Sequence, residues 1–131
     1  MANYYINSRQ YERSAVAVID GSLSQGTRML LPPGAVVTGG GYTVAAAVGG
    51  TTPTLTLVDN ASTPHTFLNA VSVASPASGA LANNTVGRYY AAGAELTFSL
   101  GGTPAAGSGK VLVWVNYIVE QTSDELYGRS G

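Results

Sequence analysis

The side chains best suited to chemistry in this sequence are one histidine, His65, and a few scattered acids. The chain has no cysteine and no second histidine, so His65 cannot head a histidine-based metal cluster. A serine nucleophile would call for a Gly-x-Ser-x-Gly turn between a strand and a helix, and that motif does not occur. We interpret His65 as a turn or surface residue, with a role at a subunit contact as the alternative.

Other arrangements that would support catalysis or cofactor binding are incomplete. Glycoside hydrolysis requires two carboxylates that face each other across a cleft, whereas Asp20, Asp59 and Glu95 stand apart beside expected turns. The glycines 39–41 lack the Gly-Lys-Ser/Thr ending of a phosphate-binding loop. Asp59 and Asn60 lack the alternating oxygen ligands of a calcium loop. We therefore expect no enzyme activity, no catalytic residue, no metal and no cofactor.

Aromatic side chains are concentrated at the two ends of the chain, where four of the eight tyrosines lie. Tyrosine offers a large contact area at a low entropic cost and is enriched at protein interfaces. The alternative is that these tyrosines pack on their own domain. We predict the following partner-binding residues: Tyr4, Tyr5, Ile6, Arg9, Tyr11, Arg13, Leu126 and Tyr127.

The composition favours partners that are proteins. The 131 residues fit one domain, and the net charge of −1 provides no basic field for nucleic acid. No segment approaches the ~20 consecutive apolar residues of a membrane helix, so we expect a soluble chain with no membrane partner. Charged residues make up 10% of the chain, against about 25% in an ordinary soluble domain. Such a neutral surface suits a chain that packs against other subunits, although a neutral surface without an assembly role is the alternative.

Short β-branched segments, separated by Gly, Pro and Asn turns, recur about every ten residues and predict strands. The expected strands are 15–19, 27–31, 35–38, 42–48, 54–58, 66–73, 88–91, 95–100 and 110–120.

The pattern also predicts how these strands are connected. We expect a flexible break at 39–41, loops at 74–84 and 101–109, and a hairpin that joins 88–91 to 95–100. The most apolar segment, 110–120, should be a central strand with Trp114 in the core. The predicted fold is all-β, a single antiparallel β-sandwich of the jelly-roll type.

Changes of composition divide the expected chain into three parts. Residues 1–13 are polar and aromatic without a sustained period, which predicts an extended N-terminal arm. The sandwich domain is expected over 14–120. Residues 121–131 return to a polar, turn-rich composition that is typical of a C-terminal tail, in which Leu126 and Tyr127 are the apolar exceptions.

Three segments carry a family resemblance that extends over about residues 26–120: Leu30–Gly40, Thr54–Asp59 and Gly109–Tyr117. Together they resemble the small β-sandwich or jelly-roll decoration (cement) proteins of tailed bacteriophages and related head-fibre or tail components. The resemblance implies a homotrimer on the outer surface of the virion capsid, placed where major capsid protein subunits meet, with a terminal arm that reaches across them.

The partners implied by this resemblance are a second copy of the chain and the major capsid protein. The resemblance leaves open whether the arm or the tail contacts the capsid, and it transfers no catalytic residue. The alternatives are a head-fibre or tail component and, from another class, a carbohydrate-binding β-sandwich. The latter would need exposed Trp or Tyr side chains beside a groove.

Overall fold

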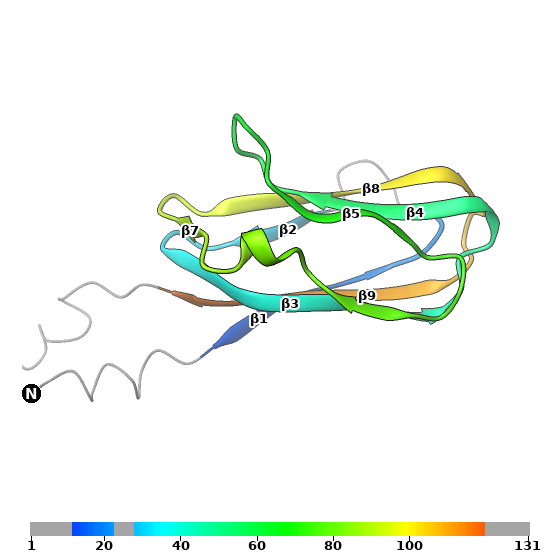
Figure 1. Ribbon diagram of the computed structural model, residues 1–131, viewed down its shortest axis with the longest axis horizontal. Coiled ribbons are helices and arrows are strands. Elements are labelled where there is room, and N and C mark those ends of the chain that lie inside the picture. The colour runs from blue at the N-terminus through cyan, green and yellow to red at the C-terminus, as the bar shows by residue number, and fades with distance from the viewer. Residues whose placement is uncertain (1–11, 23–27, 120–131) are drawn as a thin grey trace, which may run out of the picture.

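The computed structural model describes residues 12–22 and 28–119, which form two antiparallel sheets packed face to face (Figure 1). The first sheet, sheet A, consists of β1 (Arg13–Ile19), β3 (Ala35–Ala46), β6 (Ser78–Ala80), β7 (Tyr89–Tyr90) and β9 (Lys110–Val119). The second, sheet B, consists of β2 (Arg28–Leu31), β4 (Gly50–Val58), β5 (Thr66–Ser72) and β8 (Ala94–Pro104). One 3-10 turn, η1 (Asn83–Thr85), precedes β7. The predicted all-β sandwich is confirmed.

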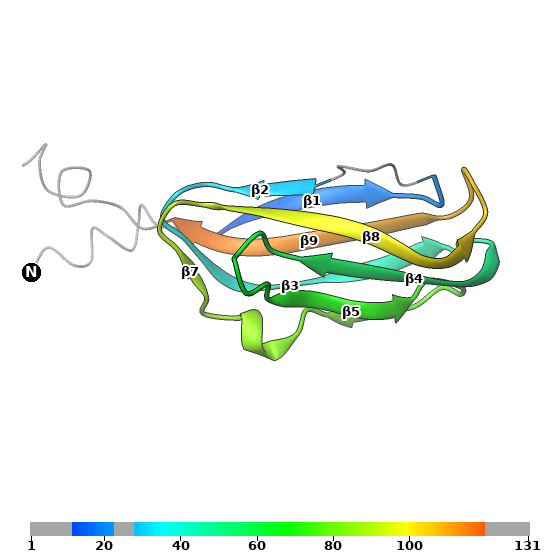
Figure 2. The same cartoon turned by 90° about the horizontal axis from the view of Figure 1, so that it is seen from above.

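The strand order identifies the sandwich as a jelly roll. Sheet A has the order β1-β9-β3-β6, with β7 on the end of β3, and sheet B has the order β2-β8-β4-β5. Apart from the short β7, the chain therefore folds as eight strands in two four-stranded sheets, with the first and last strands paired (Figure 2). Strand β9 lies between β1 and β3, so its predicted central position is confirmed.

The core lies between the two sheets and is filled by alternate residues of each long strand. In β4 and β8 the inward residues are Leu55, Leu57, Leu96 and Phe98, and all four are buried. Phe67, from β5, is the largest fully buried side chain among the described residues. The period-two pattern that predicted these strands is thus the pattern of burial, since successive side chains of a strand point to opposite faces.

The predicted flexible break at 39–41 is wrong, because β3 runs through it with a bulge between Val37 and Gly39. The glycines are needed for close packing. A Cβ atom on Gly40 would lie 2.3 Å from the carbonyl oxygen of Trp114 and 2.7 Å from Leu81, and its φ is +139°. Glycine here lets two strands and a core side chain approach one another.

Two predicted connections also differ from the structure. The expected hairpin of 88–91 with 95–100 does not form, because β7 pairs with β3 in sheet A while β8 pairs with β2 and β4 in sheet B. Between them, Gly93 takes a φ of +83° in a turn that carries the chain from one sheet to the other. The expected loop 74–84 contains the short strand β6, which pairs with residues 41–43 of β3.

The prediction that Trp114 belongs to the core is wrong as well. Val111, Val113 and Val115 of β9 are the inward, buried residues, and Trp114 is half-buried on the outer face of sheet A. The segment is apolar on both faces, but only one face contacts the other sheet.

No helix in the ranges 12–22 and 28–119 is long and apolar enough to cross a membrane.

Candidate interaction surfaces

Of the predicted partner-binding residues, the structure places Arg13 alone. It is the first residue of β1, is exposed, and stands opposite Tyr117 of β9 in the ladder. The other predicted residues lie outside the described residues: Tyr4, Tyr5, Ile6, Arg9, Tyr11, Leu126 and Tyr127. Because β1 begins and β9 ends at the same end of the sandwich, we name this the terminal end (Figure 1).

An open groove of about 640 Å³ lies beside Arg13 at the terminal end. Its lining combines opposite charges, Arg13 and Glu95, with apolar and aromatic surface from Leu30 and Tyr117. Leu30 is 66% exposed, the highest value among the large apolar side chains described. A groove of this kind can take an apolar side chain that is followed by a polar or charged group.

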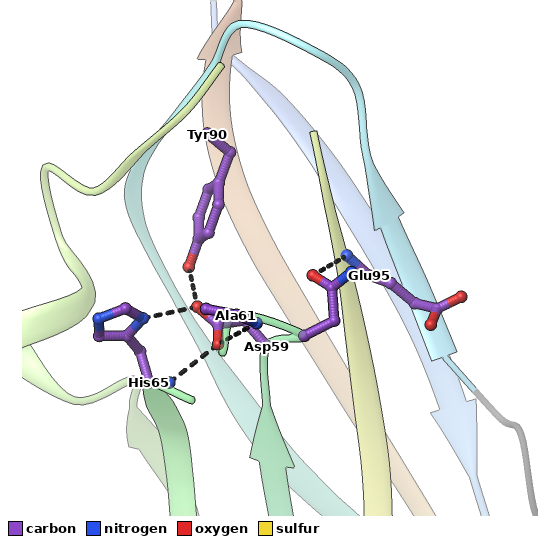
Figure 3. Close-up of polar contacts among 6 residues, drawn as sticks. Asp59, Ala61, His65, Tyr90 and Glu95 are labelled. Carbon is purple, nitrogen blue, oxygen red and sulfur yellow. Dashed lines mark hydrogen bonds and ion pairs between the residues drawn. The ribbon is translucent and has the colours of Figure 1, made fainter. Parts of the chain in front are cut away.

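A buried hydrogen-bond cluster is centred on Asp59 (Figure 3), and the next residue, Asn60, lines the groove. The Asp59 side chain has no exposed surface, and it accepts four hydrogen bonds. The backbone N–H groups of Ala61 and His65 donate to Oδ1 at 3.2 and 2.8 Å. His65 Nδ1 and the Tyr90 hydroxyl lie 2.8 and 2.7 Å from Oδ2. Since an ionised carboxylate only accepts hydrogen bonds, Nδ1 of His65 carries a proton.

The cluster joins three separate parts of the chain. Asp59 follows β4, His65 precedes β5, and Tyr90 belongs to β7 of the other sheet. The next residue, Asn60, accepts a hydrogen bond from the backbone N–H of Glu95 at 3.1 Å, which attaches the same loop to β8. The cluster therefore fixes the β4–β5 loop against both sheets at the terminal end.

The electrostatics of the cluster suit a structural role. Burial raises the pKa of the Asp59 carboxyl, but the hydrogen bonds from His65, Tyr90 and Ala61 outweigh burial and bring the pKa below its ordinary value of 3.8. Burial raises the pKa of the Tyr90 hydroxyl, and the hydrogen bond and charge of Asp59 raise it further. Asp59 thus stays ionised and Tyr90 protonated at neutral pH. A carboxylate held in this form is a poor proton acceptor.

The outer faces of the two sheets differ in chemistry. On sheet B, the outward residues of the central strands include Thr54, Thr56, Thr97 and Ser99, and an ion pair of 3.0 Å joins Arg28 to Glu95. On sheet A, the outward residues of β1 and β9 include Val16, Val18, Leu112 and Trp114. Val16 and Val18 are 61% and 62% exposed.

No protein-family model and no curated protein matches this sequence. Two solved structures share its fold. A chain of the cyanophage Pam1 capsid asymmetric unit superposes with a TM-score of 0.54 at 19% identity, over 85% of this chain and 86% of that chain. A chain of the capsid of Ralstonia phage GP4 superposes with a TM-score of 0.54 at 15% identity, over 87% of this chain and 86% of that one. At these identities the likeness establishes the jelly-roll fold along nearly the whole chain.

Two features of the surface were missed by reasoning from the sequence. Asp59 was interpreted as a turn residue. It does accept a hydrogen bond from the backbone N–H of Ala61, two residues further on, which is typical of such a turn. Its partner Tyr90 is 31 residues away and leaves no local signal. The apolar outer face of sheet A was hidden because β9 was interpreted as buried on both sides.

Proposed function

We propose that this chain is a non-enzymatic structural protein of a phage virion. It binds the outer surface of the capsid as an oligomer, a trimer, and stabilises the shell by bridging major capsid subunits. The observation that supports the proposal is the jelly roll shared, over 85% and 87% of this chain, with chains of two phage capsid structures. The neutral composition, with 10% charged residues, fits a surface that contacts other subunits.

The bridging contact is assigned to the two ends of the chain. The predicted arm, residues 1–13, ends at the first residue of β1, and the predicted tail, residues 121–131, comes after β9, so both join the sandwich at the terminal end. Thirteen residues in an extended conformation span up to ~45 Å at ~3.3–3.6 Å per residue, which is enough to cross onto adjacent capsid subunits. In this proposal Tyr4, Tyr5 and Tyr11 supply contact area, and Arg9 and Arg13 pair with acidic groups of the capsid.

A deletion of residues 2–11 tests the arm. The removed segment precedes the first residue of the sandwich ladder, Arg13. We therefore expect the truncated protein to melt within a few degrees of the full chain and to lose most of its binding to purified capsids of its phage. The matched variant is Leu126→Ala with Tyr127→Ala, which changes the tail and leaves the arm intact.

The possible outcomes separate the parts of the proposal. Loss of binding in the tail variant alone would assign the contact to Leu126 and Tyr127 and overturn the arm. Full capsid occupancy by both variants would exclude both ends as the bridging contact. Labelling of this protein on intact particles by electron microscopy distinguishes the capsid surface from a head fibre or the tail, and a signal on the tail would contradict capsid decoration.

A further inference from the structure

The outer face of sheet A carries a continuous apolar patch that we name the sheet A patch: Val16, Val18, Leu112 and Trp114. The ladder between β1 and β9 places Val16 opposite Trp114 and Val18 opposite Leu112, so the four side chains form two neighbouring pairs on the outer face. Val16 and Val18 are exposed, whereas Leu112 and Trp114 are half-buried. Large apolar residues scattered singly on a surface are ordinary, but adjacent ones on one face indicate a contact.

The neighbouring strand makes the patch flat. Gly41 of β3 stands opposite Trp114, and a Cβ atom on Gly41 would lie 3.2 Å from Cζ2 of the indole ring. The ring therefore extends over the backbone of β3, in the space that a side chain would otherwise occupy. The next outward residue of β3 is the small residue Thr43, opposite Leu112. Tryptophan near the centre of an interface is among the residues that contribute most to binding.

The opposite face of the same sandwich provides an internal comparison. Its outward residues on β8, Glu95, Thr97 and Ser99, alternate with the buried Leu96 and Phe98, as expected for a sheet with one face in water. The outward residues of β1 and β9 between positions 14 and 18 and between 112 and 116 carry no charge. Leu30, on the edge strand β2, is an apolar exception on the outer face of sheet B, but the central strands β8 and β9 differ as a free face and a covered face would.

We propose that the sheet A patch is the contact between copies of this chain. This inference rests on the proposed function, because it names the face through which the copies of the capsid-binding oligomer contact one another. The position of β1 supports it, since β1 is the edge strand of sheet A and carries the two exposed valines. A second copy that packs there covers both an apolar face and a strand that forms one edge of sheet A among the described residues.

The dimensions of the face are sufficient for such a contact. Ten residues of β9 at ~3.3 Å extend ~33 Å, and three to four strands at ~4.8 Å extend ~14–19 Å, which gives ~500–600 Å² on each copy. Since the copies of a trimer meet through different parts of their surfaces, this face of one copy would cover a similar area on its neighbour, ~1,000–1,200 Å² in total, which reaches the size of ~1,000 Å² that specific interfaces require. The rest of an oligomer contact can come from the β1 edge.

The chain provides its own probe, because Trp114 is its one tryptophan. Light scattering and tryptophan emission are measured together while the protein is diluted from about 50 μM to about 50 nM. We expect a multiple of the 13.3 kDa chain mass at high concentration. On dilution the mass should fall, and the emission should shift to longer wavelength as Trp114 meets water.

Two single substitutions form a matched pair. Val16→Glu places a charge in the patch at a position 61% exposed, and Ser99→Glu places the same charge on the exposed outer face of sheet B. We expect Val16→Glu to weaken self-association at least 100-fold and to leave the circular dichroism spectrum unchanged. We expect Ser99→Glu to associate like the wild type. Acrylamide quenching of Trp114 should increase in the first variant and stay the same in the second.

The contrary results are distinct. A Val16→Glu variant that remains an oligomer with shielded Trp114 would overturn the patch as the contact between copies, and the proposed capsid binding would stand. A wild-type protein that is monomeric at 50 μM, with an emission shift only when capsids are added, would assign the patch to the capsid and overturn the self-contact. Failure of the oligomer to bind capsids would instead refute the proposed function and leave the self-contact intact.

Discussion

Replacement of Asp59 by alanine tests whether the buried cluster stabilises the terminal end. The substitution removes the acceptor of four hydrogen bonds. The Nδ1 atom of His65 can turn to water, because the side chain is 30% exposed, so its loss costs little. The Tyr90 hydroxyl and the backbone N–H of His65 are left without an acceptor, at about 1–2 kcal/mol each. We therefore expect Asp59→Ala to lower the free energy of unfolding by about 2–4 kcal/mol.

The assay is equilibrium unfolding in urea followed by circular dichroism, at one protein concentration because an oligomer's stability depends on it. For an m-value of about 2 kcal/mol/M, the expected loss moves the midpoint down by about 1–2 M. Tyr90→Phe removes one donor to the ionised carboxylate and should cost about 1.5–3 kcal/mol. In the Asp59→Ala background the same change should instead raise the free energy of unfolding by about 1–2 kcal/mol, because it removes a hydroxyl that has been left without an acceptor.

Two results would refute this reasoning. One is an Asp59→Ala variant that unfolds within about 0.5 kcal/mol of the wild type, which lies in the range of a neutral surface substitution. The other is a cost for Tyr90→Phe that is the same with and without Asp59, since that would show that the two side chains do not interact.

Three further predictions concern the backbone, the core and pH. Gly40→Ala should lower the free energy of unfolding by at least about 3 kcal/mol, because its Cβ would lie 2.3 Å from the carbonyl oxygen of Trp114. Gly49→Ala should melt near the wild type, because its Cβ would lie 3.5 Å from the nearest atom. Equal melting temperatures of the two variants would contradict the close packing of β3. In urea unfolding, Leu96→Ala should lower the free energy of unfolding by about 2–5 kcal/mol, because Leu96 is buried in the core. Leu30→Ala should lower it by less than about 0.5 kcal/mol, because Leu30 is 66% exposed. The reverse order would invalidate the assignment of inner and outer faces. Since the pKa of Asp59 is lowered in the folded state, the stability that its ionised form contributes is fully present above the ordinary carboxyl pKa of 3.8 and is lost as pH falls through the folded pKa. Between pH 6 and pH 2, the unfolding midpoint of Asp59→Asn should therefore fall less steeply than that of the wild type. Parallel slopes would argue against the lowered pKa.

The sequence was most informative where one strand pattern has one structural meaning. Alternation of Thr and Leu over 54–58 predicted a half-buried strand, and Leu55 and Leu57 are buried as expected. The strand connections were less predictable, because most consecutive strands of this jelly roll lie in different sheets. A local pattern of turn residues between 88–91 and 95–100 is the same for a hairpin and for a crossing between sheets.

The functional surfaces were harder to predict for two physical reasons. Trp114 lies in a segment that is apolar on both faces, and periodicity cannot distinguish a strand covered twice in its own domain from one that presents an apolar face to the outside. The Asp59 cluster depends on a contact with Tyr90 in the other sheet, which only the folded chain brings about. The tyrosines at positions 4, 5, 11 and 127 lie outside the described residues, so their partner contacts stay a prediction.

The pairing of the first strand with the last also determines how the protein bears mechanical load. The ladder runs from Arg13 opposite Tyr117 to Ile19 opposite Val111, and both chain connections attach at its Arg13 end. A pull that separates the two connections therefore loads the rungs one after another and peels β1 from β9 at low force. A pull that draws both connections in the same direction loads the strands together and leaves the ladder closed. The sandwich is thus built to be tethered by both ends toward one side, and it is weak as a link stretched between two opposing anchors.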